Sequence, residues 1–451
     1  MASNNQSSPI PLLHFRSVFT QVLLISATAF CTIGSFNALQ GLGGAGQETP
    51  YVANAATAIN FGLLGVVCIL AGPVINLLGV RWSLFIGTCG DPIFGAAVYY
   101  NTRYGTQWFL VFAAIIRGAC SGLFWAAEGS VIIAYPRDQH RGKSITLWVF
   151  AKELGSVVSS AINLGLSVRD DKPGHVGYAV YYATIAIMCC GIPLALLLSP
   201  SHKVRHRDGT RLDINNSGTY GLEYRRLGQI LRKKEVLLLL PYAWFAYFYY
   251  SFSHTFVAKH FTVRARALTS LLTSLASILG SFIIAMFSDT RLSSKAPLSL
   301  LTTLVLTLCG GGWIYCGYVA ITSNPKQKLD WVDPGYAKEA MGVVIVFMVM
   351  QSAQTYLYWT AARLSSSVRD RFHMAGVIRG VESLGQCVAY GVNTSSTKPA
   401  LNVGLNLGFY VLGATSLMAL LWRESEYSKD ETVGHGPDAW ECVDDLQQPK
   451  S

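Results

Sequence analysis

Twelve apolar stretches of about 20 residues each, separated by short polar segments, most constrain how this chain of 451 residues can fold. A helix of about 20 apolar residues spans the ~30 Å hydrocarbon core of a membrane. Only 13% of the residues are charged, whereas soluble proteins carry about 25%. These features exclude a soluble globular enzyme, a coiled coil and a disordered scaffold. They predict an all-α polytopic membrane protein in which twelve helices cross the lipid bilayer.

The longest polar segment between spans, 199–235, divides the chain into two halves of nearly equal length. Six predicted spans precede it and six follow it, at 17–38, 51–75, 82–100, 108–134, 144–166, 177–198, 236–256, 265–288, 296–319, 337–361, 372–393 and 400–422. We therefore predict two six-helix bundles, 17–198 and 236–422, as in transporters built from repeated halves. The N-terminus (1–16), the basic segment (199–235) and an acidic, unstructured tail (423–451) lie outside them.

The distribution of positive charge predicts how the chain is oriented. Lys and Arg are about twice as frequent on the side of the termini and the central segment as on the other side, which places both termini in the cytoplasm. The net charge of +10 therefore reflects membrane orientation and not nucleic-acid binding. The sequence fits the plasma membrane or an endomembrane equally well. Asn393 begins an Asn-Thr-Ser sequon on the outer side and is a predicted glycosylation site.

Two short loops at equivalent places in the halves share a pattern. Gly72, Asn76, Gly79 and Arg81 lie at the junction of spans 2 and 3, and a degenerate copy with Asp289 and Arg291 follows span 8. The pattern resembles the loop signature of the major facilitator superfamily, in which a tight turn and a charged pair lock the cytoplasmic helix ends together. Asn76 stands where that signature has an acid, so the first lock is expected to be weaker.

More specific strings lie in span 4 (GLFWAAEG, 122–129), before span 8 (FTVRARAL, 261–268) and in span 11 (AGVIRGVES, 375–383). They resemble the fungal branch of the uncoordinated-93-like family within that superfamily, and the resemblance runs from about residue 15 to 422. It implies a twelve-helix facilitator fold and a transporter-like role. Some animal members of the family instead act as channel regulators or trafficking partners.

Charged residues inside the spans are the candidate site, because a charge at the bilayer centre costs roughly 2.5–3.5 kcal/mol on insertion scales and normally faces a partner or a wet cavity. The candidate cavity and coupling residues are Arg117, Glu128, Lys152, Glu153, Arg379 and Glu382. Arg379 and Glu382 are three positions apart on one helix and can touch. Lys152 and Glu153 are adjacent and diverge by about 100°, so each is expected to pair with another helix.

Two interpretations of these charges are open. In one, Glu128, Glu153 or Glu382 exchanges a proton, since burial and nearby cations shift a carboxyl between its two forms. In the other, the charges form static ion pairs between helices. Asp91, in the peripheral span 3, is expected to serve packing rather than to contact a substrate.

The aromatic residues of spans 7 and 10 also allow two interpretations. Eight aromatic side chains between Tyr242 and Phe252, together with Tyr356, Tyr358 and Trp359, suit a bulky, weakly polar organic substrate. Helix packing and the interfacial aromatic belt explain them equally simply. Eight aromatics within eleven positions must cover every face of span 7, so most of them are not expected to line a cavity.

Nothing in the sequence indicates catalysis. No nucleotide-binding Gly-rich loop is present, and the nine histidines lack metal-ligand spacing; no cofactor or metal is therefore expected. The sequence favours a secondary transporter that moves a small organic solute, with a hydrophobic metabolite for export as our working hypothesis, by alternating access that includes proton coupling. The alternative is a non-transporting regulator or trafficking partner of another membrane protein.

Overall fold

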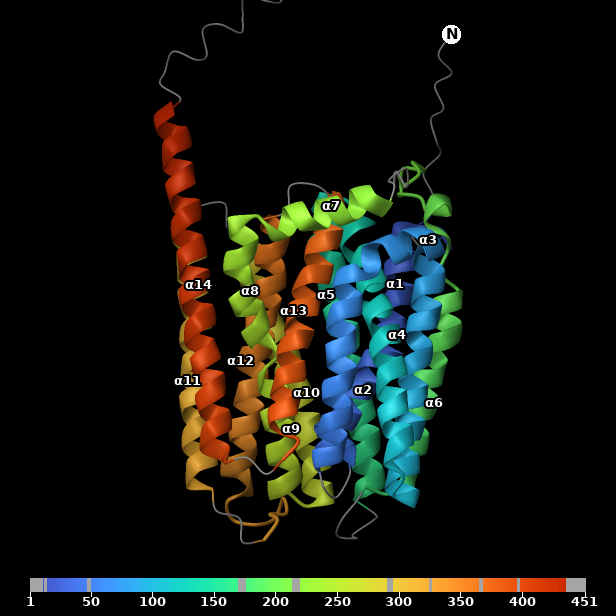
Figure 1. Ribbon diagram of the computed structural model, residues 1–451, viewed down its shortest axis with the longest axis vertical. Helices are drawn as coiled ribbons and strands as arrows, with labels where there is room; N and C mark the ends of the chain where they lie inside the picture. Colours follow the sequence, from blue (N-terminus) through green and yellow to red (C-terminus); the bar gives the residue numbers. More distant parts are fainter. Residues whose placement is uncertain are drawn as a thin grey trace, which may run out of the picture.

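The computed structural model describes residues 11, 14–46, 50–168, 176–212, 220–289, 295–323, 327–364, 368–395 and 398–434, and this part of the chain is almost entirely helical (Figure 1). The helices are α1 (Val18–Ala29), η1 (Phe30–Gly34), α2 (Ser35–Gly41), η2 (Gly44–Gly46), α3 (Pro50–Tyr104), α4 (Gln107–Ala134), α5 (Asp138–Ser167), α6 (Tyr178–Leu196), η3 (Ser201–Lys203), α7 (Tyr220–Leu231), α8 (Lys234–Ala246), α9 (Tyr249–His260), α10 (Val263–Asp289), α11 (Lys295–Thr322), α12 (Tyr336–Arg363), α13 (Val368–Val392) and α14 (Pro399–Gly434).

These helices account for all twelve predicted crossings. Ten stretches of the described residues are long and apolar enough to cross a membrane. The other two predicted spans are the second limb of α3 and the charged helix α13. Span 1 is continuous through α1, the π-helical turn η1 and α2, and span 7 is divided into α8 and α9. The twelve-helix prediction is therefore confirmed.

Gly79 separates the two limbs of α3. Its φ of 77° and ψ of 154° belong to a backbone region that essentially only glycine adopts. The limbs run in opposite directions on either side of it, which places this turn at the end of the molecule where the chain also begins (Figure 1). We call this the terminal end, and we call the opposite end, which carries the Tyr104–Gln107 turn, the distal end. The tight turn predicted between spans 2 and 3 is confirmed.

The halves of the chain stand side by side, with α1–α6 on the right and α8–α14 on the left of Figure 1. Between them, α3 packs against α13 and α5 packs against α10. Small residues allow the first contact: a Cβ atom added to Gly380 would lie 2.9 Å from the backbone oxygen of Gly65 and 2.3 Å from Ile69. Gly380 thus allows α13 to pack closely against α3, as small residues do in other membrane bundles.

Hydrogen bonds join the two halves on the distal side of the midplane. Ser156 and Ser160 of α5 bond to Ser274 and Ser270 of α10 over 2.8 and 2.9 Å. Nδ2 of Asn54 on α3 donates to Oγ1 of Thr255 over 3.0 Å and to the backbone oxygen of Asn393 over 2.8 Å. These four contacts hold the distal halves of the bundles together.

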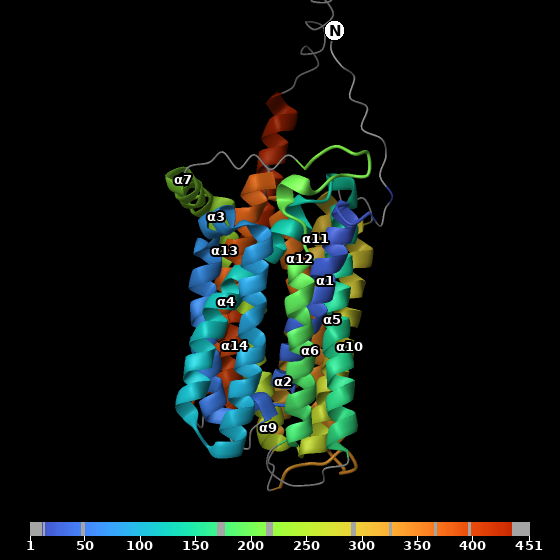
Figure 2. The same cartoon turned by 90° about the vertical axis from the view of Figure 1, so that its right-hand side faces the viewer.

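Two segments differ from the sequence prediction. The predicted loop 199–235 contains the helix α7, which lies across the terminal end in Figure 1 and is seen nearly end-on in Figure 2. Its buried Leu227 and Ile230 explain this, because an apolar pair three residues apart stabilises a short helix by packing. The unstructured tail predicted from residue 423 is wrong for 423–434, where α14 continues to Gly434. Extending an existing helix avoids the cost of nucleation.

Candidate transport site

A small cavity lies between the two halves and receives residues from both. Its volume is about 20 Å³, which is enough for roughly one water molecule. Two arginines, several aromatic rings and amide side chains line it: Ile33, Phe36, Asn37, Gln40, Phe61, Leu64, Arg117, Trp125, Tyr247, Tyr250, Arg379, Gln386 and Tyr390. Of the span 7 aromatics only Tyr247 and Tyr250 are in this lining, which agrees with the expectation that most of them pack elsewhere.

Arg117 on α4 is held by partners within the first half of the chain. Its Nε lies 2.7 Å from Oδ1 of Asp91, on the second limb of α3, and its Nη1 donates to Oδ1 of Asn60 over 3.0 Å. Its guanidinium carbon stands 3.4 Å from the ring centroid of Phe36. Both members of the ion pair are buried. Asp91 therefore serves the packing of the first bundle, as expected, by neutralising a cavity-lining arginine.

Glu128, also on α4, is fully buried and differs from the other acids of the site. Its Oε1 accepts a hydrogen bond from the indole nitrogen of Trp148 on α5 over 2.6 Å, and its Oε2 has no partner. Among the described residues, no lysine or arginine nitrogen forms an ion pair with it. The charged groups that interact with it electrostatically are Lys152 on α5, Arg379 on α13 and Asp91 on α3.

Lys152 and Glu153 on α5 pair with each other, since Nζ lies 3.0 Å from Oε1 and both side chains are buried. The expectation that each would pair with another helix is wrong. Their Cβ atoms diverge, but the four-carbon stem of lysine is flexible enough to bend its ammonium group back to the neighbouring carboxylate. Nζ also lies 5.5 Å from the centroid of the Trp148 ring, which places it beside the Glu128 contact.

Arg379 and Glu382 on α13 form the corresponding pair in the second half, with Nη1 3.1 Å from Oε2 as their spacing predicts. Glu382 also accepts hydrogen bonds from the hydroxyl of Tyr358 over 3.0 Å and from Nε2 of Gln354 over 3.4 Å. The Arg379 guanidinium lies over the Trp125 ring of the first half at 4.0 Å. This arginine therefore contacts both bundles.

The predicted gate loops are described only in part. A Cβ atom on Gly72 would lie 3.4 Å from the His373 ring of α13, so this glycine allows the two halves to approach at the terminal end. Nε of Arg81 is buried without a hydrogen bond. The side chains of Asn76 and Asp289, and all of Arg291, lie outside the described residues. Locking by these loops stays a prediction.

Asn393, the predicted glycosylation site, is only 1% exposed. Its Nδ2 donates to Oγ of Ser251 over 3.0 Å and to Oδ1 of Asn402 over 3.0 Å, and its Oδ1 accepts from Nδ2 of Asn402. A glycan on this nitrogen would have to replace those contacts. Glycosylation stays a prediction that this burial disfavours.

Several polar neighbours of the site gave no signal in the sequence. Asn60, Gln354 and Gln386 are single uncharged residues in apolar spans, and their importance follows only from which helices meet. Trp148 is likewise one aromatic among many. Among the described residues, no cluster of three metal-ligating side chains is present.

The fold defines the class of protein: a polytopic helical membrane protein with the two-bundle architecture that solved transporters share. The xylose transporter XylE from Escherichia coli, in a partially occluded inward-open conformation, superimposes with a TM-score of 0.63. The match covers 89% of this chain and 97% of that one at 14% identity. A POT family transporter in complex with 5-aminolevulinic acid gives a TM-score of 0.61 at 13% identity, over 91% of this chain and 96% of that one. At these identities the likeness shows the fold.

The chain belongs to the Major Facilitator Superfamily, whose sequence profile matches residues 12–390. It is 31% identical over 415 residues to the Notoamide biosynthesis cluster protein O' of Aspergillus versicolor, covering 90% of this chain and 89% of that protein. It is 28% identical to UNC93-like protein 1 of Arabidopsis thaliana, covering 86% of each chain. The resemblance to the uncoordinated-93-like family is confirmed.

Proposed function

We propose that the protein is a secondary transporter that carries a small organic solute between its two bundles by alternating access, and that protonation of Glu128 is coupled to this movement. The observation that carries the proposal is the isolation of Glu128 among buried charges. Asp91, Glu153 and Glu382 each have a cationic partner, whereas Glu128 has one hydrogen bond and an unpartnered oxygen.

A lone carboxylate in an apolar interior is unfavourable, so a buried acid of this kind takes up a proton. The conformation described here therefore favours neutral Glu128. A conformation that admits water to α4 would favour the ionised form. Proton uptake and release would thus bias the two states of the bundles, which is the thermodynamic requirement for coupling. Lys152 lies near enough to influence whether Glu128 is protonated, because the Trp148 side chain contacts both residues.

The aromatic lining of the cavity and the relative named for a biosynthesis cluster support an organic solute with an apolar body. The cavity of about 20 Å³ is too small for one, so the described state is occluded and the solute enters when the bundles separate. In this proposal the bundles 17–198 and 236–422 move as two bodies. The terminal end, with its basic central segment, faces the cytoplasm.

Distances between spin labels test the proposal. Val80→Cys and Leu364→Cys, in a cysteine-depleted background, place labels at the terminal ends of the two halves. In nanodiscs we expect two distances, with the shorter one gaining population as the pH falls from about 8 to about 5.5. Glu128→Gln, which mimics the neutral acid, should hold the low-pH distribution at both pH values. Glu235→Gln, at the partly exposed start of α8, is the matched control and should respond like the wild type. One distance that ignores pH would overturn the coupling.

A non-transporting regulator is the second candidate. Asn76 stands in place of the acid of the loop signature and favours this candidate. Without that acid, the loop lacks the charged pair that would hold the cytoplasmic helix ends of a carrier together. Purification in a mild detergent separates the two functions. A stoichiometric membrane partner, together with a single label distance that ignores both pH and added solutes, would favour the regulator.

A further inference from the structure

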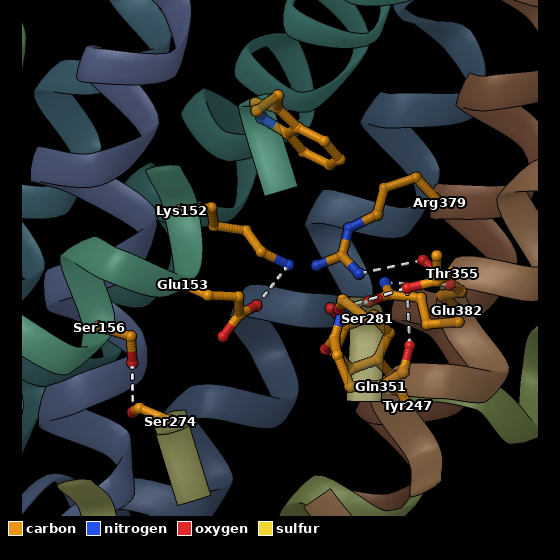
Figure 3. Close-up of polar contacts among 12 residues, drawn as sticks. Lys152, Glu153, Ser156, Tyr247, Ser274, Ser281, Gln351, Thr355, Arg379 and Glu382 are labelled. Atoms are coloured by element: carbon orange, nitrogen blue, oxygen red, sulfur yellow. Dashed lines mark hydrogen bonds and ion pairs between the residues drawn. The ribbon is translucent and has the colours of Figure 1, made fainter. Parts of the chain in front are cut away.

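Two cations from opposite bundles face each other at the centre of the molecule. In Figure 3 the ammonium group of Lys152, on α5, and the guanidinium of Arg379, on α13, point toward one another. Each has its own acid within the same helix, at 3.0 Å for Glu153 and 3.1 Å for Glu382. The ion pairs of the site therefore lie within the bundles, while like charges meet across the interface. An anion placed between the two cations would be attracted by both.

Arg379 also has hydrogen-bonding capacity to spare. A guanidinium carries five N–H donors, and only Nη1 is directed to Glu382. Nε is buried and has no hydrogen-bond acceptor, and Arg379 as a whole is only 6% exposed. A buried donor without an acceptor is uncommon in folded proteins. It indicates a position that a ligand oxygen would complete.

Two arginines line the cavity, whereas their acidic partners do not. Arg117 from the first half and Arg379 from the second are both among its lining residues, whereas Asp91, Lys152 and Glu382 are not. Asp91 and Glu382 therefore balance the charge of the two arginines without lining the cavity themselves. The remaining lining is mostly aromatic, with Phe36, Trp125 and Tyr247 next to the two cations.

We infer that the transported solute is an organic monocarboxylate whose carboxylate binds between Lys152 and Arg379 and whose apolar or aromatic body lies against the rings of the cavity. This inference rests on the proposed function. Guanidinium groups match the planar geometry of a carboxylate. A single negative charge fits better than a phosphate, because each cation of the site already has an acid partner and little net positive charge is left.

The inference gives the proton a definite role. Without solute and with Glu128 ionised, the site carries one uncompensated negative charge. With Glu128 protonated and a carboxylate bound, it carries the same net charge, since one proton and one anion have been added. Transport of one carboxylate together with one proton is therefore electroneutral.

Matched pairs of probes test the charge of the solute directly. We would measure the thermal unfolding of the full-length protein in nanodiscs with indole-3-acetate, benzoate and octanoate, and with the primary amide of each. We expect at least one carboxylate to stabilise the protein saturably, with an affinity about tenfold above that of its amide. No preference for any of the three carboxylates would overturn the inference.

Paired variants keep this test valid if single changes unfold the protein. Lys152→Gln with Glu153→Gln, and Arg379→Gln with Glu382→Gln, remove a cation without leaving a lone acid. Each should abolish the preference for the carboxylate, and Arg379→Lys should restore part of it. Lys338→Gln, at the exposed start of α12, is the control. A preference that survives both paired variants would overturn the assignment of these residues.

The spin-label distances separate this inference from the proposed function. Distances that still shift with pH, in a protein that does not prefer carboxylates, would overturn the solute class and leave transport standing. A carboxylate preference combined with one immobile distance would support the binding site and overturn alternating access.

Discussion

Asp91 and Arg117 form an ion pair between the second limb of α3 and α4, with Oδ1 and Nε 2.7 Å apart and both side chains about 5% exposed. The pair joins two adjacent helices of the first bundle through their cores. Because Arg117 also lines the cavity, the acid on the peripheral helix fixes the position of a group in the candidate site.

Replacing Asp91 should therefore destabilise the protein strongly. Asp91→Leu leaves Arg117 buried without its counter-ion, and breaking such a pair typically costs about 3–5 kcal/mol. The double variant Asp91→Leu, Arg117→Met removes both charges and should lose much less stability. Chemical unfolding of the purified protein in detergent measures both. Equal losses in the single and double variants would contradict this account.

The fold could be predicted from the sequence because it depends on long segments with one dominant property. Twelve apolar stretches, a polar break after the sixth and the glycine at position 79 are enough to place the helices and the first tight turn. The Arg379–Glu382 contact was predictable for a related reason: both residues lie on one helix, and helix geometry alone brings them together.

The rest of the site depends on which helices meet, and this is not encoded locally. The sequence contains seven charged residues within spans but does not show which acid on another helix reaches Arg117, and only the packing of α4 against the second limb of α3 brings Asp91 to it. Nor does spacing show that the flexible Lys152 side chain turns back to Glu153. Asn60 and Trp148 acquire their roles only as neighbours of these charges, so no pattern in the sequence distinguishes them.

Asn393 should carry no glycan in the folded protein. Its side chain joins α13 to Ser251 of α9 and to Asn402 of α14, and a glycan would remove these contacts. Treatment of the expressed protein with an endoglycosidase should leave its electrophoretic mobility unchanged. Asn393→Ala should lower stability by about 1–3 kcal/mol, because it leaves buried amide partners unsatisfied. Thr394→Ala, which destroys only the sequon, is the control and should be close to neutral. A mobility shift that disappears in Thr394→Ala would show that the site is used.

Gly79 should not tolerate a side chain, although there is space for one. No atom lies within 4 Å of an added Cβ, so any effect of Gly79→Ala comes from the backbone. Holding a residue other than glycine at φ 77° and ψ 154° costs about 1–3 kcal/mol. Gly311→Ala, in helix α11 and also with nothing within 4 Å, is the matched control and should be neutral or slightly stabilising. Thermal unfolding measures the stability of both variants. Equal changes in stability would contradict a strained turn at Gly79.

Asp330 should make the distal end sensitive to acid. It lies in the connection between α11 and α12, where Oδ1 accepts hydrogen bonds over 2.8 Å from both Nε of Arg264 and Oγ1 of Thr262. The hydrogen bond from Arg264 is the largest factor that lowers the pKa of Asp330 below its ordinary value of 3.8. A lowered pKa means that the folded state prefers the ionised acid. Its stabilising effect is complete well above pH 3.8 and is lost as the pH falls through the lower, folded-state pKa.

Asp330→Asn should therefore reduce stability by about 1–2 kcal/mol near neutral pH, because it weakens a charge-assisted hydrogen bond that is only partly exposed. The difference from the wild type should shrink as the pH is lowered below 3.8. Arg264→Gln removes the cation that lowers the pKa, so it should reproduce the neutral-pH loss and the weakened acid dependence. Thermal unfolding in detergent at several pH values measures all three proteins. A stability difference between Asp330→Asn and the wild type that stays constant down to the lowest pH would show that the ionised carboxylate does not stabilise the distal end.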